Sequence, residues 1–374
     1  MERDNQKILE ELEKKGIPVY SFSRIECINN CKYEAYRTYI LNDRNNQIPN
    51  IYSVLGGRIH DVLEQMMNNQ ASESDLYPAM NKELDDMDML GIEFPKSKDG
   101  SDGIRQGWIT DMTHFCYSYT KPKGKFETET FLLYETPNKH YIQGYIDLTK
   151  YNKDGSISIY DYKTSSMYHG EDIKKHGRQL ILYALGKEQE GYVVKEVAWI
   201  MLKYCEVFYI GKKTSRSKEE TNLSKIIERK NIVKDLRNVI EYKLEKLGFD
   251  ELDIEVKMLT ALDKNEIPSE VANDFIIKPY VMKYDLSDET RKDCIEYIDN
   301  TIMQWESLEN NENNYPPVSF TKMIKKEVNG KEVEIEKENC FYCYSMCGYS
   351  SQTCPYFQTY LETKQKKNED DDLW

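Results

Sequence analysis

The stretch from Gly144 to Lys163 constrains the fold of this chain more than any other part of the sequence. Two segments rich in strand-favouring residues are joined there by Asn152-Lys153-Asp154-Gly155, and an Asp-Gly pair between such segments is a strong β-hairpin signal. Side chains alternate between the faces of a strand, so Asp161 and Lys163 share one face of the second strand. The first strand carries Asp147. A folded hairpin therefore brings two carboxylates and an ammonium group close together.

This arrangement favours a particular chemistry. Two neighbouring carboxylates repel each other unless a cation lies between them, and Mg²⁺ takes carboxylate oxygens while keeping several waters. A lysine beside such an ion can orient a water molecule and offset the charge of a phosphate. The pattern indicates metal-assisted hydrolysis of a phosphodiester. Taken alone, the D-x-K motif also fits a hairpin that carries ordinary surface charges.

Two helical segments flank the hairpin, and each carries a pair of polar residues four positions apart, which places the pair on one helix face. The pairs are His60 with Glu64 upstream and Gln179 with Tyr183 downstream. The order G-x-x-x-H, G-x-I-D, D-x-K and Q-x-x-x-Y resembles the PD-(D/E)xK nuclease superfamily, most of all its RecB-like and Cas4-like exonucleases. The four motifs lie between Gly56 and Tyr183.

The resemblance implies an α/β fold with the restriction-endonuclease-like αβββαβ core, helical insertions, and an iron–sulfur clasp that joins the N- and C-terminal segments. We expect one nuclease domain over residues 1–374. Its expected parts are a catalytic core at 50–205, a helix-rich insertion at 211–275, the clasp from 21–45 with 315–360, and an acidic disordered tail at 365–374.

The resemblance also implies roles for individual residues. The catalytic Mg²⁺ or Mn²⁺ would be held by four groups: His60, Asp147, Asp161 and the carbonyl of Tyr162. Lys163 would position and activate the attacking water, while Gln179 and Tyr183 would brace the site or touch the DNA backbone. An acidic residue of the preceding strand, either Glu129 or Glu127, would lie nearby. Phosphate contacts are expected from three basic residues around Gln179, namely Lys174, Lys175 and Arg178.

Nine cysteines are unevenly distributed, and four of them lie close together near the C-terminus: Cys340, Cys343, Cys347 and Cys354. In a cytosolic chain such a cluster suggests a metal rather than disulfides. Zinc held by these four thiols is one interpretation. The resemblance to Cas4-like and AddB-like nucleases favours a 4Fe–4S cluster on Cys31, Cys340, Cys343 and Cys354. Ten residues separate Cys343 from Cys354, a longer spacing than is usual in the family, so Cys347 or Cys27 stays open as a replacement ligand.

The net charge of −14 argues against a broadly basic nucleic-acid-binding surface, so any DNA contact must be local. The sequence has no apolar run of about eighteen residues, which predicts that no segment spans a membrane. It also has no signal-peptide core, so we expect a cytoplasmic location, which is the host cytoplasm if the protein is phage-encoded. The implied activity is a metal-dependent exonuclease on DNA with free ends, single-stranded or processed duplex, in recombination, repair or phage replication.

The alternative function is a DNA-end-binding or assembly subunit whose nuclease activity is secondary. The sequence contains no G-x-x-x-x-G-K-[ST] motif, so any unwinding motor must be a separate chain. A helicase or a single-stranded-DNA-binding protein is a possible protein partner.

Overall fold

The computed structural model describes residues 4–97, 99–211, 221–328, 331–349 and 353–371 of the chain. The chain divides into two compact units, and each unit is assembled from separate stretches of sequence. The first unit comprises Met1–Val54, Phe131–Tyr145 and Ser287–Trp374; the second comprises Leu55–Thr130 and Ile146–Leu286. Strands β2 (Lys125–Glu135) and β3 (Tyr141–Tyr151) each begin in one unit and end in the other. The residues predicted to form one domain are thus divided between two units.

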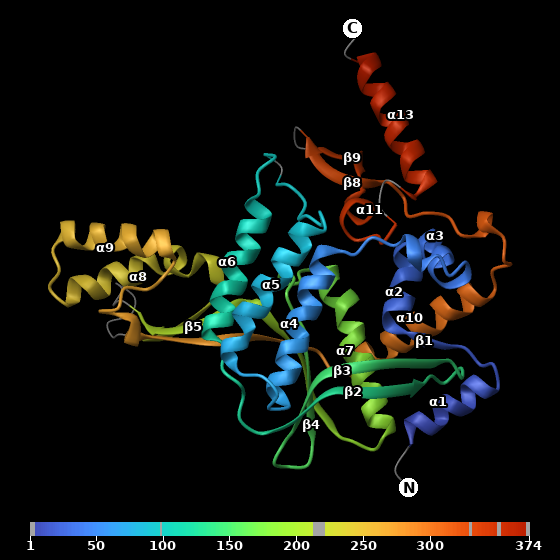
Figure 1. The fold of residues 1–374 in the computed structure, drawn as a ribbon, viewed down its shortest axis with the longest axis horizontal. Helices are drawn as coiled ribbons and strands as arrows, with labels where there is room; N and C mark the ends of the chain where they lie inside the picture. Colours follow the sequence, from blue (N-terminus) through green and yellow to red (C-terminus); the bar gives the residue numbers. More distant parts are fainter. Residues whose placement is uncertain (1–3, 98, 212–220, 329–330, 350–352, 372–374) are drawn as a thin grey trace. The chain divides into compact units, whose positions relative to one another are not determined.

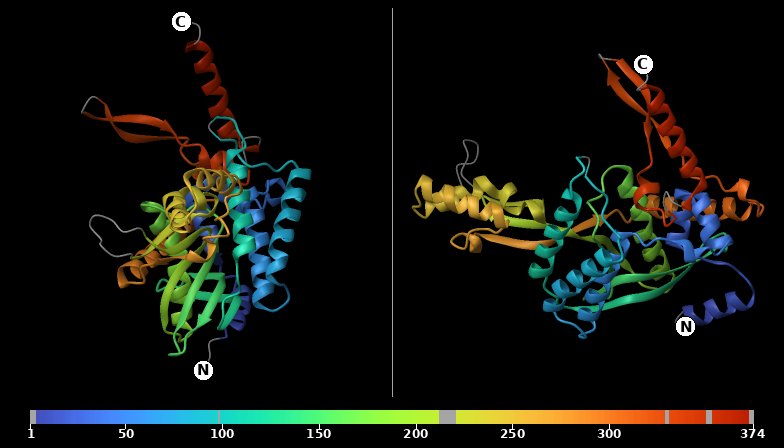
Figure 2. Two further views of the ribbon diagram at one scale, coloured as in Figure 1. Left: turned by 90° about the vertical axis from the view of Figure 1, so that its left-hand side faces the viewer. Right: turned by 45° about the horizontal axis from the view of Figure 1, so that its top comes forward.

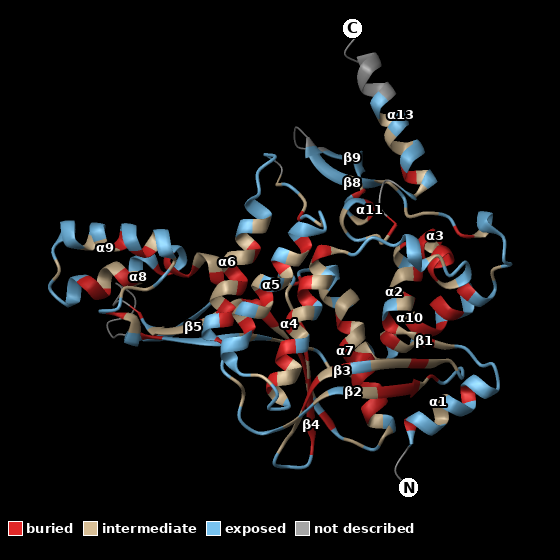
Figure 3. Ribbon diagram, in the orientation of Figure 1, coloured by how far each residue is buried: buried red, intermediate tan, exposed pale blue. Residues whose placement is uncertain are grey.

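A mixed sheet forms the centre of the second unit (Figure 1). Strand β4 (Ile157–Lys163) pairs antiparallel with β3 and parallel with β5 (Val194–Ile210). Strand β5 also pairs antiparallel with β6 (Asn222–Glu228) and with β7 (Phe275–Tyr284). Most side chains of β4 are buried (Figure 3), as expected for a strand with neighbours on both edges.

Helices of the second unit cover this sheet. They are most of α4 (Ile51–Met67), then α5 (Leu76–Met89), α6 (Gly103–Ser118) and α7 (Glu171–Gln189). Helix α7 packs against β4 and β5, and α6 packs against β5. The predicted order of helix, three strands, helix and strand is present as α4, β2, β3, β4, α7 and β5, with α5 and α6 inserted after α4.

The segment predicted as a helix-rich insertion contains β6 and two helices, α8 (Ile232–Lys246) and α9 (Glu251–Lys264), which lie side by side in both views of Figure 2. It has an apolar core of its own, because one face of α8 packs on β5 and on α9. Buried side chains of that core include Val207, Leu236, Ile240, Leu244 and Met258.

The hairpin predicted around Asn152–Gly155 is confirmed. The amide of Gly155 donates to the carbonyl of Asn152 at 3.1 Å, and Gly155 has a φ of 84°, a conformation that favours glycine. The register places Leu148 opposite Tyr160. One step further along, Asp147 and Asp161 therefore lie on neighbouring strands at the same level of the sheet.

The first unit contains the N-terminal elements α1 (Asn5–Lys14), β1 (Val19–Ser21), α2 (Phe22–Asn30) and α3 (Lys32–Ala35). Its C-terminal elements are α10 (Asp288–Glu306), the hairpin of β8 (Thr321–Val328) and β9 (Lys331–Glu338), α11 (Phe341–Ser345) and α13 (Pro355–Asp371). Ser21 caps the start of α2, because its Oγ accepts the amide of Arg24 at 3.2 Å. Helix α2 packs against both α3 and α10.

The C-terminal end differs from the prediction of a disordered tail from residue 365. Helix α13 starts at Pro355, a residue suited to the first helical position, and continues to Asp371 through a sequence rich in Gln, Lys and Glu. Residues 372–374 lie outside the described part of the chain. No helix in the described ranges is both long and apolar enough to cross a lipid bilayer.

Candidate active site

Two carboxylates, one buried and one partly buried, form the centre of the candidate site, and both belong to the second unit. Asp161 on β4 is only 2% exposed, and its Oδ2 atom lacks a hydrogen-bond partner of acceptable geometry. Oδ2 of Asp147 on β3 accepts the backbone amide of Tyr162 at 2.8 Å. Burial and the charge of Asp161 raise the pKa of Asp147 well above its usual value. A cation between the two carboxylates would relieve this repulsion.

Lys163 supplies the positive charge beside these carboxylates. Its Nζ atom lies 2.6 Å from Oδ2 of Asp161 and donates to Oε1 of Gln179 at 3.3 Å. Burial acts to lower the pKa of Lys163, but Asp161, Tyr168 and Asp147 together outweigh burial and raise that pKa above its ordinary value. Nε2 of Gln179 in turn donates to the hydroxyl of Tyr183 at 2.8 Å. The sequence-predicted pair on α7 therefore braces the ammonium group.

His60 reaches the same carboxylates from α4. Its Nδ1 atom lies 3.4 Å from Oδ2 of Asp147, and burial lowers the pKa of His60, which favours the neutral imidazole. One turn earlier, Gly56 explains the glycine of the G-x-x-x-H motif. A Cβ atom there would lie only 3.2 Å from Oγ1 of Thr164, the residue that follows Lys163. The absence of a side chain at Gly56 lets α4 approach the end of β4.

A further carboxylate, Glu129, comes from β2. Burial raises the pKa of Glu129, with added contributions from Glu64, Asp61 and Asp161. Its backbone has a φ of 47°, which is strained for a residue other than glycine and is often found at functional sites. Glu127, the alternative that the sequence left open, instead accepts the hydroxyl of Tyr151 at 2.5 Å. The structure therefore directs Glu129 toward the site.

The basic residues predicted to contact DNA lie on α7. Lys174 is exposed, and Lys175 and Arg178 are half-buried.

Sequence reasoning missed an aromatic stack in the same region, where the ring of His176 lies on Tyr168 with centroids 4.2 Å apart. No spacing in the sequence signals this pair, because Tyr168 belongs to the loop between β4 and α7.

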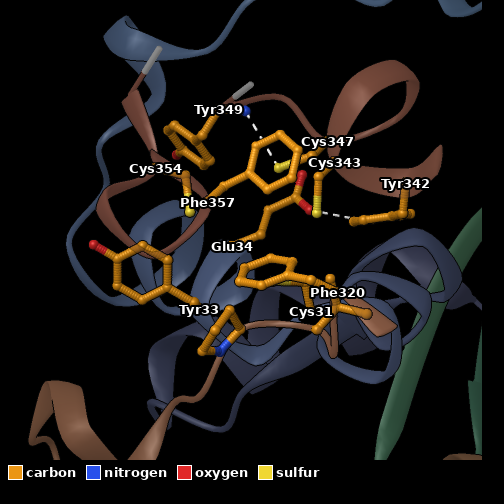
Figure 4. A pocket seen from close by; sticks show the side chains of 12 residues that line it. Cys31, Tyr33, Glu34, Phe320, Tyr342, Cys343, Cys347, Tyr349, Cys354 and Phe357 are labelled. Carbon is orange, nitrogen blue, oxygen red and sulfur yellow. Dashed lines mark hydrogen bonds between the residues drawn. The ribbon is translucent and has the colours of Figure 1, made fainter. Parts of the chain in front are cut away.

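The first unit holds a small cavity of about 10 Å³, and four of its lining residues are cysteines (Figure 4). These four are Cys31, Cys343, Cys347 and Cys354. Cys340, which the sequence predicts as a metal ligand, does not line the cavity; its sulfur lies 3.4 Å from the carbonyl oxygen of Phe320. Cys347, which the sequence left open as a replacement ligand, does line the cavity. A buried carboxylate in the cavity wall, Glu34, was missed altogether.

Over the part of the chain that the structure describes, no three His, Cys, Asp or Glu side chains are gathered in the arrangement of a metal site. The side chains of both candidate sites are nonetheless of chemical types that bind metal ions. The candidate catalytic group offers the buried carboxylate of Asp161, which the ammonium of Lys163 contacts, and a second carboxylate, Asp147, whose pKa is raised. The cavity in the first unit offers four thiols.

The sequence model of the PD-(D/E)XK nuclease superfamily matches residues 19–269, about two thirds of the chain. The matched range includes Cys31 and every residue predicted for the catalytic site, and it ends before the C-terminal cysteines. No curated protein matches the chain.

Proposed function

The chain belongs to the PD-(D/E)XK nuclease superfamily, and from this premise we propose that it is a metal-dependent exonuclease that hydrolyses phosphodiester bonds at free DNA ends. One observation carries the proposal. Asp161 presents a buried carboxylate, which the ammonium of Lys163 contacts at 2.6 Å, beside the partly buried carboxylate of Asp147. Paired carboxylates attract a divalent cation, and an ammonium group attracts a phosphate. Together they suit phosphodiester hydrolysis.

We assign the catalytic Mg²⁺ or Mn²⁺ to His60, Asp147, Asp161 and the carbonyl of Tyr162. Oxygen ligands suit Mg²⁺, and an imidazole ligand also admits Mn²⁺. The lowered pKa of His60 keeps this side chain in the neutral form that binds metals. When bound, such a metal supplies a more acidic water molecule and polarises a phosphate oxygen.

In this proposal Lys163 acts as a cation rather than as a base. Its raised pKa keeps the ammonium protonated at neutral pH, so Lys163 holds water and phosphate oxygens by charge and hydrogen bonding. Gln179 fixes the direction of the ammonium, and Tyr183 fixes Gln179. This chain of contacts supports a positioning role for the Q-x-x-x-Y motif.

We propose that DNA follows α7, where Lys174, Lys175 and Arg178 neutralise backbone phosphates. The net charge of −14 makes such a local contact necessary, and binding should weaken steeply with salt. We also propose a helicase or a single-stranded-DNA-binding protein as a partner, and this sequence contains no P-loop of its own.

We also propose that the cysteine-lined cavity binds a 4Fe–4S cluster, with zinc as the alternative. Thiolates are the usual ligands of such clusters. The thiols come from distant parts of the sequence, since Cys31 and Cys343 are about three hundred residues apart. A shared metal would close this long loop and so remove chain entropy from the unfolded state. The small volume of the cavity means that the sulfurs must rearrange around the metal.

The test compares linear and closed-circular DNA of one sequence, single- and double-stranded, with Mg²⁺ or Mn²⁺. Wild-type protein should shorten end-labelled linear DNA and leave closed circles intact, while Asp161→Asn should cleave neither. Cutting of closed circles at the linear rate would identify an endonuclease instead. Tight binding to DNA ends without cleavage by wild-type protein would favour the end-binding subunit.

A further inference from the structure

A buried carboxylate lies among the thiols of the cysteine cavity (Figure 4). Glu34 is 8% exposed and belongs to α3, three residues after Cys31. The catalytic scheme in the second unit gives it no role. A buried carboxylate is costly unless hydrogen bonds satisfy it, so the contacts of Glu34 indicate what the side chain does.

Both oxygens of Glu34 bind the C-terminal segment that carries two of the thiols, which comprises α11 and the turn that follows it. Oε2 accepts the hydroxyl of Tyr342 at 2.6 Å, and Oε1 accepts the backbone amide of Gly348 at 3.0 Å. These two donors bracket the segment, because Cys343 follows the first and Cys347 precedes the second. One carboxylate therefore fixes both ends of the segment beside Cys31.

The surroundings of the two competing thiols differ. The sulfur of Cys347 faces the cavity and accepts the backbone amide of Tyr349 at 3.5 Å. Amide N–H groups are suitable partners for a thiolate that binds a metal. The sulfur of Cys340 lies outside the cavity lining, 3.4 Å from the carbonyl oxygen of Phe320, where a protonated thiol can donate.

We propose that Glu34 is a positioning residue that holds Cys343 and Cys347 beside Cys31, and that Cys340 is not a metal ligand. The resulting ligand set is Cys31, Cys343, Cys347 and Cys354. The inference rests on the proposed metal in this cavity and is independent of the nuclease site. The four sulfurs line one cavity without being drawn to ligating distance, so binding requires side-chain rotation while the Glu34 contacts hold the backbone.

The test uses the full chain, purified without oxygen, as wild type and as the single variants Cys347→Ser, Cys340→Ser and Glu34→Gln. Iron, sulfide and zinc are measured per chain. The metal content per chain should fall about tenfold or more in Cys347→Ser. Cys340→Ser should keep the wild-type metal content. Glu334→Gln, an exposed change on β9, is the control for Glu34→Gln.

Two further measurements separate positioning by Glu34 from a general loss of stability. In Glu34→Gln the residual cluster should show an altered electron paramagnetic resonance spectrum after reduction, and the metal-free protein should unfold at a lower temperature. Glu334→Gln should match wild type in both measurements. A Glu34→Gln protein that matches this control would overturn the positioning role.

The outcomes also distinguish this inference from the nuclease proposal. Loss of metal in Cys340→Ser with full metal in Cys347→Ser would overturn the ligand set. Wild-type protein that contains neither iron nor zinc would overturn the inference and the cofactor proposal together, even if it cleaves DNA. Protein that fails to cleave DNA but shows the expected metal contents would support the inference and refute the nuclease proposal.

Discussion

The ammonium nitrogen of Lys163 lies 2.6 Å from Oδ2 of Asp161, a carboxylate that is almost completely buried. In the metal-free protein this ion pair supplies the positive charge that two neighbouring carboxylates require. On the proposed mechanism, Lys163 and a divalent cation would stabilise the same pair of aspartates. Lys163 would therefore also be a structural residue in the absence of metal.

The first prediction follows from this ion pair. In Lys163→Met, Asp161 loses its cation and stays buried, so the unfolding free energy of the metal-free protein should fall by about 3 kcal/mol. Urea denaturation in EDTA measures this loss. The double variant Lys163→Met with Asp161→Asn should recover most of it, because no buried charge is then left unpaired. Equal stability of Lys163→Met and wild type would show that the ion pair contributes nothing.

A second prediction concerns Asp147. The pKa of the Asp147 carboxyl is raised in the folded protein, so folding favours its protonated form. At neutral pH the ionised carboxylate therefore lowers the unfolding free energy. Asp147→Asn should therefore raise the unfolding free energy of the metal-free protein by about 1 kcal/mol at pH 8, while cleavage is lost. The expected gain disappears at low pH, where the wild-type carboxyl is already protonated. A destabilised Asp147→Asn protein at pH 8 would contradict the electrostatic account.

A third prediction concerns acid sensitivity. Burial, together with the charges of Lys175 and Lys163, lowers the pKa of His176 from 6.5 to about 4. The unfolded chain therefore binds a proton between pH 6.5 and 4 that the folded protein excludes, and stability falls as the pH falls through this window. His176→Phe keeps a ring against Tyr168 and removes the titration. Between pH 7 and 4, wild type should lose about 2 kcal/mol more unfolding free energy than His176→Phe; equal losses would refute the assignment.

A fourth prediction concerns how α7 is placed. A Cβ atom added at Gly177 would overlap the ring of Tyr284 on β7. Gly177→Ala should cost about 2 kcal/mol of unfolding free energy despite the better helix propensity of alanine, and it should slow cleavage because Gln179 moves with the helix. Gly57→Ala on α4 is the control, since nothing lies within 4 Å of the added atom. If both variants are equally stable, α7 does not depend on this close approach.

The catalytic hairpin could be predicted from the sequence because its signals are local. Strand alternation and the Asp-Gly turn set which side chains of β4 share a face, and pairing with β3 then brings Asp147 to Asp161. The helix pair Gln179 and Tyr183 follows from a spacing of four in the same way. In both cases the geometry of a single strand or helix determines which side chains share a face.

The cysteine cavity could not be predicted to the same degree. Which of Cys340 and Cys347 faces the cavity depends on the placement of α11 and the turn after it, and Glu34 contacts this segment from more than three hundred residues away in the sequence. The strained backbone of Glu129 was equally invisible, because nothing in its neighbours demands a positive φ.

The central claim is that Asp147, Asp161 and Lys163 form one metal-dependent site for phosphodiester hydrolysis. The most direct test is single-turnover cleavage of end-labelled linear DNA by Asp161→Asn beside wild type, with saturating Mg²⁺ and with the fold of both proteins checked by circular dichroism. The account predicts a folded Asp161→Asn protein whose cleavage rate falls by more than about a hundredfold. Cleavage by folded Asp161→Asn at the wild-type rate would contradict it.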